Sequence, residues 1–133
     1  MKKKIFYIPV FIALAFFSAG IAWAGGMSLV RKSADLTVQV VMDKNPSVGK
    51  NAVRVALKDA SGAAVTDALM RVYYSMPAMG GMPAMNYYAN AVPRGKEYVA
   101  VMDIPMAGSW GVAVKIKRGG RLLPPVKFSA DAQ

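Results

Sequence analysis

The chain of 133 residues contains neither cysteine nor histidine. Without cysteine it can form no disulfide, no thiolate metal site, no thiol nucleophile and no lipid-modified cysteine. Without histidine it lacks the commonest general base and the commonest transition-metal ligand. Blue-copper centres, zinc hydrolase sites and Ser-His-Asp triads are therefore excluded.

Acidic residues are also scarce, seven against seventeen lysines and arginines, and they are scattered along the chain. No spacing between them is typical of a pair of catalytic carboxylates. No glycine-rich phosphate loop follows a strand and opens a helix. We therefore expect a protein that is not an enzyme. The acids are Asp35, Asp43, Asp59, Asp67, Glu97, Asp103 and Asp131.

The first 24 residues have the three parts of an export signal. Lys2-Lys3-Lys4 form a positive region, residues 5–17 are almost entirely apolar, and Ala22-Trp23-Ala24 forms a cleavage site. Residues 5–24 are also just long enough to span a bilayer, so an uncleaved anchor in the inner membrane is the alternative. In both cases we expect the rest of the chain to be periplasmic or otherwise extracytoplasmic.

The chain remains basic after cleavage. Without the three leading lysines, fourteen basic residues stand against seven acidic ones, a net charge of +7. Because the chain is expected to be exported, we expect no nucleic-acid partner. Contact with an anionic membrane surface or with an acidic protein is compatible with this charge. The simpler interpretation is that most of these residues alternate with apolar ones on the solvated face of strands.

After the signal, apolar and polar residues alternate with a period of two, and turn residues recur at regular intervals. This pattern predicts an all-β, immunoglobulin-like antiparallel β-sandwich of about seven strands over residues 34–133, after a leader at 25–33. Trp110 is expected in the core, and the last strand at an edge because Pro124-Pro125 cannot donate to a ladder. The expected strands are 34–42, 51–59, 68–74, 86–92, 97–104, 110–117 and 122–130.

The most distinctive stretch is the repeat MPAM-GG-MPAM at residues 76–85. It holds four of the ten methionines at a spacing of three: Met76, Met79, Met82 and Met85. The methionine thioether is a soft ligand that suits Cu(I) and Ag(I) and does not suit Mg, Ca or Mn. The glycine pair lets the two halves fold back on each other and bring sulfurs together.

The geometry of that turn decides how many sulfurs can meet. A spacing of three is the period of a polyproline II helix, which would place the thioethers on one side, about 9 Å apart. In a regular β-hairpin Met76 and Met79 would point to opposite faces. A tight hairpin therefore argues against a four-sulfur site, and an irregular loop argues for one. The alternative is that these methionines are adaptable apolar side chains that pack or cover a contact surface.

Other short motifs occur in a recognisable order. They are Pro46-Ser-Val-Gly49-Lys-Asn51, Val53-x-Val55-x-Leu57-x-Asp59, Met76-Pro77-x-Met79, Gly95-x-x-Tyr98 and Met106-x-Gly108-x-Trp110. In this order they resemble the YtkA-like / FixH-like family of exported or membrane-anchored domains, over roughly residues 34–118. The resemblance implies a small extracytoplasmic β-sandwich that is not an enzyme. Similar domains are found beside copper-handling, heavy-metal efflux and oxidase-assembly systems.

The family's MP-x-M element corresponds to Met76, Pro77 and Met79, and its M-x-G-x-W element to Met106 and Trp110. This chain departs from the pattern by doubling MP-x-M and by lacking histidine. The doubling favours a soft-metal site, and the missing histidine leaves methionine alone to form it. We therefore expect an envelope module that binds Cu(I) or Ag(I) through its methionine-rich loop, with Met106 as a further ligand if its turn lies nearby. The alternative is an interaction domain that docks a metal transporter or an oxidase subunit through an apolar methionine patch.

Overall fold

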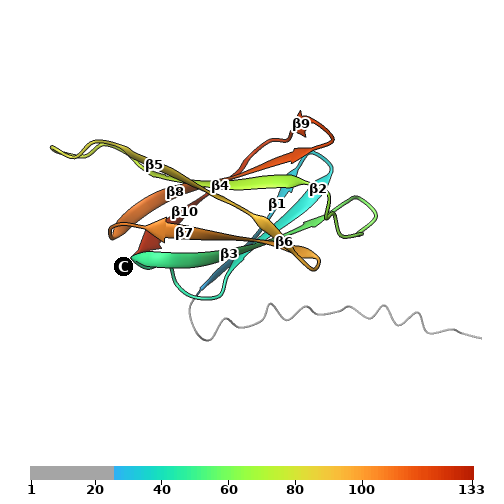
Figure 1. Cartoon of the computed structure of the whole chain (residues 1–133), viewed down its shortest axis with the longest axis horizontal. Helices are drawn as coiled ribbons and strands as arrows, with labels where there is room; N and C mark the ends of the chain where they lie inside the picture. The colour runs from blue at the N-terminus through green and yellow to red at the C-terminus, as the bar shows by residue number, and fades with distance from the viewer. Residues whose placement is uncertain (1–25) are drawn as a thin grey trace, which may run out of the picture.

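The computed structural model describes residues 26–133, which form two antiparallel β-sheets packed face to face (Figure 1). Sheet I contains, in spatial order, β1 (Met27–Ser33), β2 (Leu36–Met42), β3 (Gly49–Lys58), β7 (Glu97–Ile104) and β6 (Val92–Arg94). Sheet II contains β10 (Val126–Ala132), β8 (Gly108–Arg118), β4 (Leu69–Met76) and β5 (Met85–Asn90), and β9 (Arg121–Leu122) pairs with the end of β8. The predicted all-β sandwich is confirmed.

The order of the strands is that of an immunoglobulin-type sandwich. If the edge strand β1 and the short β6 and β9 are set aside, seven strands remain. The first (β2), second (β3) and fifth (β7) of these pair in sheet I. The seventh (β10), sixth (β8), third (β4) and fourth (β5) pair in sheet II. The fourth strand thus joins the sheet of the third, as it does in variable-type domains. Within residues 26–133, no helix is long and apolar enough to cross a membrane.

The segment expected to be a leader, residues 25–33, instead contains strand β1. It pairs along its whole length with β2, from Met27 opposite Met42 to Ser33 opposite Leu36. Met27 and Leu29 pack against the core from this strand. Strand β1 was not predicted from the sequence, because exposed Val30 and the following Arg31-Lys32 interrupt the alternation of apolar and polar residues. The predicted export signal at residues 1–24 lies outside the described residues.

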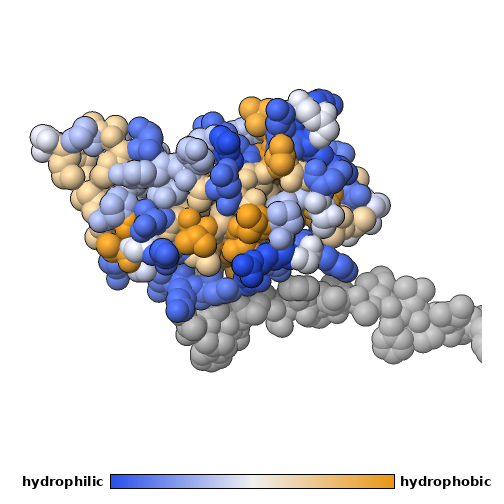
Figure 2. Space-filling model, in the orientation of Figure 1, coloured by the Kyte–Doolittle hydropathy of each residue, from blue (hydrophilic) through white to orange (hydrophobic). Residues whose placement is uncertain are grey.

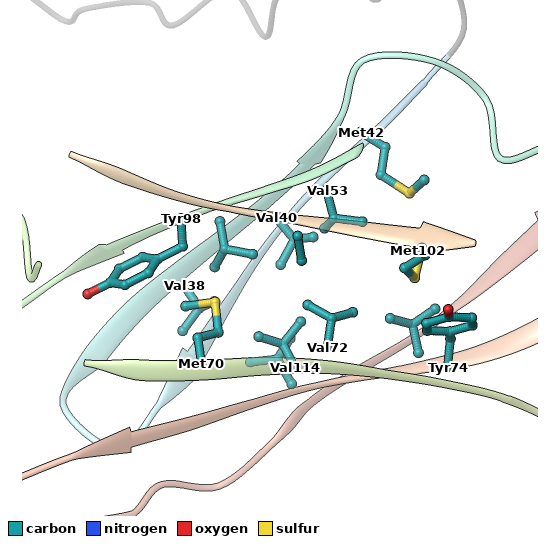
Figure 3. Close-up of a cluster of buried hydrophobic side chains, with 14 of the residues drawn as sticks. Val38, Val40, Met42, Val53, Met70, Val72, Tyr74, Tyr98, Met102 and Val114 are labelled. Carbon is teal, nitrogen blue, oxygen red and sulfur yellow. The ribbon is translucent and has the colours of Figure 1, made fainter. Parts of the chain in front are cut away.

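The core lies between the two sheets and follows the predicted alternation. Figure 3 shows Val38 and Val40 of sheet I facing Val72 and Val114 of sheet II. Trp110 is completely buried, as predicted. The last strand lies at the edge of sheet II, but the reason differs from the expected one, because Pro124-Pro125 precede β10 instead of interrupting it.

Two of the family motifs prove to be structural. The buried amide of Asn51 accepts a hydrogen bond from Ser47 N at 2.9 Å and donates to the carbonyls of Ser47 and Gly49, at 2.7 and 2.8 Å. The buried Tyr98 hydroxyl accepts a hydrogen bond from Ala68 N at 3.0 Å. These side chains lock the segments that precede β3 and β4, because a buried polar atom is costly unless it is paired.

Candidate functional site

The methionine repeat forms the end of the β4–β5 hairpin. The register runs from Tyr74 opposite Tyr87 through Met76 opposite Met85 to a bridge between Met79 and Met82. At this bridge Met79 N donates to Met82 O at 3.1 Å and Met82 N donates to Met79 O. Figure 1 shows the hairpin extending beyond the end of the sandwich, and Figure 2 shows its tip as mainly apolar.

The turn is tight, and its two residues are Gly80 and Gly81. Gly81 has a φ of 83°, in the region that favours glycine. Because the two MPAM halves are equally far from the turn, the hairpin places each methionine opposite another methionine. The result is two cross-strand pairs, Met76 with Met85 and Met79 with Met82. This is the tight hairpin that, of the two predicted geometries, argues against a single four-sulfur site.

The two pairs lie in different surroundings. Met76 is only 2% exposed and belongs to the core. Its methyl group lies against Gly108, where an added Cβ would be 2.7 Å from Met76 Cε. Met85 is half-buried, whereas Met79 and Met82 are 54% and 45% exposed. Met79 and Met82, which we call the tip pair, are therefore the methionines of the repeat that are most open to a ligand from solution.

Met106 lies at the base of the hairpin. It is half-buried against the core, and its carbonyl accepts a hydrogen bond from Trp110 Nε1 at 3.0 Å. Because Gly108 contacts Met76, the turn that carries Met106 lies beside the buried end of the repeat. Met102 is fully buried in β7. The five predicted ligands thus divide into an exposed tip pair and a group at the base: Met76, Met85 and Met106.

Three aromatic rings brace the base of the hairpin, and the predicted ligand set did not include them. Tyr74 and Tyr87 stack with ring centroids 5.6 Å apart, and Trp110 lies 6.1 and 6.2 Å from them. The Tyr74 hydroxyl also accepts a hydrogen bond from Asp103 N at 3.1 Å. The sequence does indicate this aromatic pairing, because a Tyr-Tyr dipeptide lies equally far from the glycine pair on each side. A hairpin centred on that pair places the tyrosines in register.

Three of the acidic residues, Asp43, Glu97 and Asp59, form ion pairs or turn hydrogen bonds that stabilise the fold. Asp43 and Glu97 lie 2.6 and 3.2 Å from the Arg54 guanidinium. Asp59 closes a turn, and its hydrogen bond from the Ser61 hydroxyl, followed by that from Ala63 N, lowers the pKa of its carboxyl. Across residues 26–133, no three His, Cys, Asp or Glu side chains come together as a metal site. A metal bound there would therefore need other donors, and methionine sulfur is the soft donor that the hairpin exposes.

These features define a class: an immunoglobulin-type sandwich with no disulfide and with a methionine hairpin projecting from one end. The chain belongs to the YtkA-like family, whose model matches residues 31–115. The match runs from β1 into β8 and includes the whole methionine hairpin, and it confirms the resemblance found in the motifs. No curated protein and no solved structure matches the chain.

Proposed function

We propose that this chain is an extracytoplasmic binding module without catalytic activity, and that it takes Cu(I) or Ag(I) at the hairpin tip through Met79 and Met82. One observation carries the proposal: these exposed methionines lie directly opposite each other across a tight turn. Opposed residues in a hydrogen-bonded pair have Cα atoms about 5.5 Å apart. Unbranched thioether side chains can converge on one ion from that separation.

The tip pair supports a site of two sulfurs. A site of four sulfurs from the repeat would require Met76 to leave the core, which would open a void beside Gly108. Two neutral sulfurs give modest affinity, since no deprotonated thiolate and no imidazole contributes. Such a site suits reversible exchange of a soft ion with a partner in the cell envelope.

A docking role for the same hairpin is the second candidate. Residues 77–84 are all exposed and include no charged side chain. An apolar projection of this kind is typical of a contact surface, and methionine adapts its shape to a partner. The partner would be another envelope protein, such as a metal transporter or an oxidase subunit.

Anaerobic titration of residues 25–133 with Cu(I), in competition with a chromophoric chelator, tests the metal site. We expect one ion per chain, and we expect binding to vanish when Met79 and Met82 are both replaced by leucine. Leucine keeps the apolar volume and removes the sulfur. The matched control is Met85→Leu, which removes a sulfur from the same repeat and should leave the affinity nearly unchanged.

The same variants distinguish docking from metal binding. If the wild-type chain takes up no Cu(I) and no Ag(I), the metal proposal is wrong. Crosslinking in the envelope then tests the docking role. A contact patch should tolerate leucine at Met79 and Met82 but lose its partner when both become serine.

A further inference from the structure

The outer face of sheet II carries exposed leucines and cations in adjacent rows. The register places Leu69 of β4 beside Lys117 of β8, and Lys117 beside Leu122 of β9. Leu69 and Leu122 are 71% and 68% exposed, more than any other large apolar residue in the described chain. In the next row Arg71 lies beside Lys115. Near β9, at the top of the molecule, Figure 2 shows strongly apolar and hydrophilic residues side by side.

The cations of this face have no acidic partners among residues 26–133. The ion pairs there involve Arg54 and Arg118, and none involves Arg71, Lys115 or Lys117. Two of the cations instead lie over aromatic rings. Lys115 Nζ lies 4.4 Å from the Tyr73 ring centroid, and the Arg71 guanidinium lies 4.9 Å from that of Tyr88. The charges of Arg71 and Lys115 are therefore held in place by these rings, and these two residues and Lys117 are available to an anion.

A groove runs between these residues. It has a volume of about 630 Å³, and its lining includes Leu69, Arg71, Tyr73, Lys115, Lys117 and Leu122. The groove thus combines basic walls with an apolar edge on one side of the sheet. It lies at the end of β4 opposite the methionine hairpin, because Leu69 begins this strand and Met76 ends it.

We propose that this face docks on a bilayer of anionic phospholipid, with the cations at the head groups and the two leucines at the boundary with the acyl chains. An acidic soluble partner would need only the cations, and it would not account for the two exposed leucines. Two highly exposed leucines on either side of Lys117 match the interface of a membrane, where apolar side chains insert and lysines extend to the phosphates. Docking in this way leaves the methionine hairpin free at the far end of the sandwich.

Co-sedimentation with vesicles tests the proposal, using residues 25–133, which carry all ten strands and the described core. The vesicles are phosphatidylcholine alone or an equal mixture with phosphatidylglycerol. We expect binding to the anionic vesicles only, and we expect high salt to weaken it. Replacing Lys115 and Lys117 together by glutamate should lower the partition coefficient by about tenfold or more. Leu69→Ser with Leu122→Ser should lower it without changing the net charge.

The matched control is Lys50→Glu with Lys96→Glu, which changes the net charge equally at exposed sites outside this face. It should lower binding by less than about threefold. Circular dichroism melting confirms that each variant is folded.

An equal loss in the control pair, or binding to neutral vesicles, would overturn the proposal. So would binding to soluble polyglutamate but not to vesicles, which would assign the face to an acidic partner. Leucine at Met79 and Met82 should leave vesicle binding unchanged, so this proposal and the metal proposal can fail separately.

Discussion

Asn51 and Ser33 are the two buried polar residues of the described chain, and each binds backbone groups. Asn51 closes the loop that precedes β3, through Ser47 and Gly49. Ser33 donates a hydrogen bond to the Pro124 carbonyl, in the segment that precedes β10 of the opposite sheet. At the scale of single residues, the buried polar atoms of this sandwich thus hold connections in place. The motif that ends at Asn51 is explained by this loop and needs no ligand.

We expect Asn51→Ala to lower the free energy of unfolding by about 2–3 kcal/mol. The change removes three partly buried hydrogen bonds, each of which contributes about 1 kcal/mol. Urea denaturation measures the loss. Asn86→Ala is the control, because this exposed asparagine should cost less than about 0.5 kcal/mol. Equal losses in the two variants would show that the Asn51 amide does not hold the loop.

The β4–β5 hairpin is the element that distinguishes this chain. Its sequence is symmetric about Gly80-Gly81, from the tyrosine dipeptides at its base to the methionines at its tip. The base is braced by the stacked rings of Tyr74 and Tyr87 and by the core contact of Met76. The tip lies outside the core, so its geometry depends on the turn itself. Any function of Met79 and Met82 therefore depends on the conformation of these two glycines.

Gly81→Ala should loosen the tip, whereas Gly80→Ala should not. Gly81 has a φ of 83°, which costs an alanine about 1 kcal/mol or more, whereas Gly80 is not among the residues with positive φ. Neither added Cβ would meet another atom within 4 Å, so the backbone alone decides the difference. We expect the amide protons of Met79 and Met82 to exchange about fivefold faster in Gly81→Ala. Equal exchange rates in the two variants would contradict this account of the turn.

In the whole molecule, the sheets are joined by polar ties as well as by the core. Val48 N donates to Gln133 O at 3.1 Å, and Gln133 N donates to Pro46 O at 3.2 Å. These bonds attach the residue after β10 in sheet II to the loop between β2 and β3 in sheet I. The Ser33–Pro124 bond is a second tie, between β1 and the segment before β10. The first tie fixes the end of β10, the edge strand of sheet II, and the second fixes the end of β1, the edge strand of sheet I.

Gln133→Pro should lower the free energy of unfolding by about 1 kcal/mol. Proline lacks the N–H that binds the Pro46 carbonyl, and a backbone bond of this kind contributes about that much. Gln133→Ala is the matched control and should be nearly neutral, because it keeps the backbone donor. Thermal unfolding compares the two variants. A loss in the alanine variant as large as in the proline variant would assign the effect to the side chain instead.

Much of the fold could be predicted because a half-buried strand alternates locally. The inward positions Val53, Val55 and Leu57 of β3 follow from their period of two. The glycine pair indicated that the chain folds back at residues 80–81, but it left a tight hairpin and an irregular loop open, and the structure has the tight hairpin. Strand β1 could not be predicted in the same way, because its Met27 and Leu29 become inward positions only when it pairs with the edge of β2.

The sequence by itself determined the inventory and the alternation: no cysteine, no histidine, a period of two, and a methionine repeat symmetric about two glycines. These properties are local, so they can be recognised from the sequence without knowing which strands pair. Only the tertiary structure decided that Met76 is buried and Met79 is exposed, since burial depends on where Gly108 and the opposite sheet end. It also brought Leu69, Lys117 and Leu122 into one row, because strand pairing joins residues that are far apart in the chain.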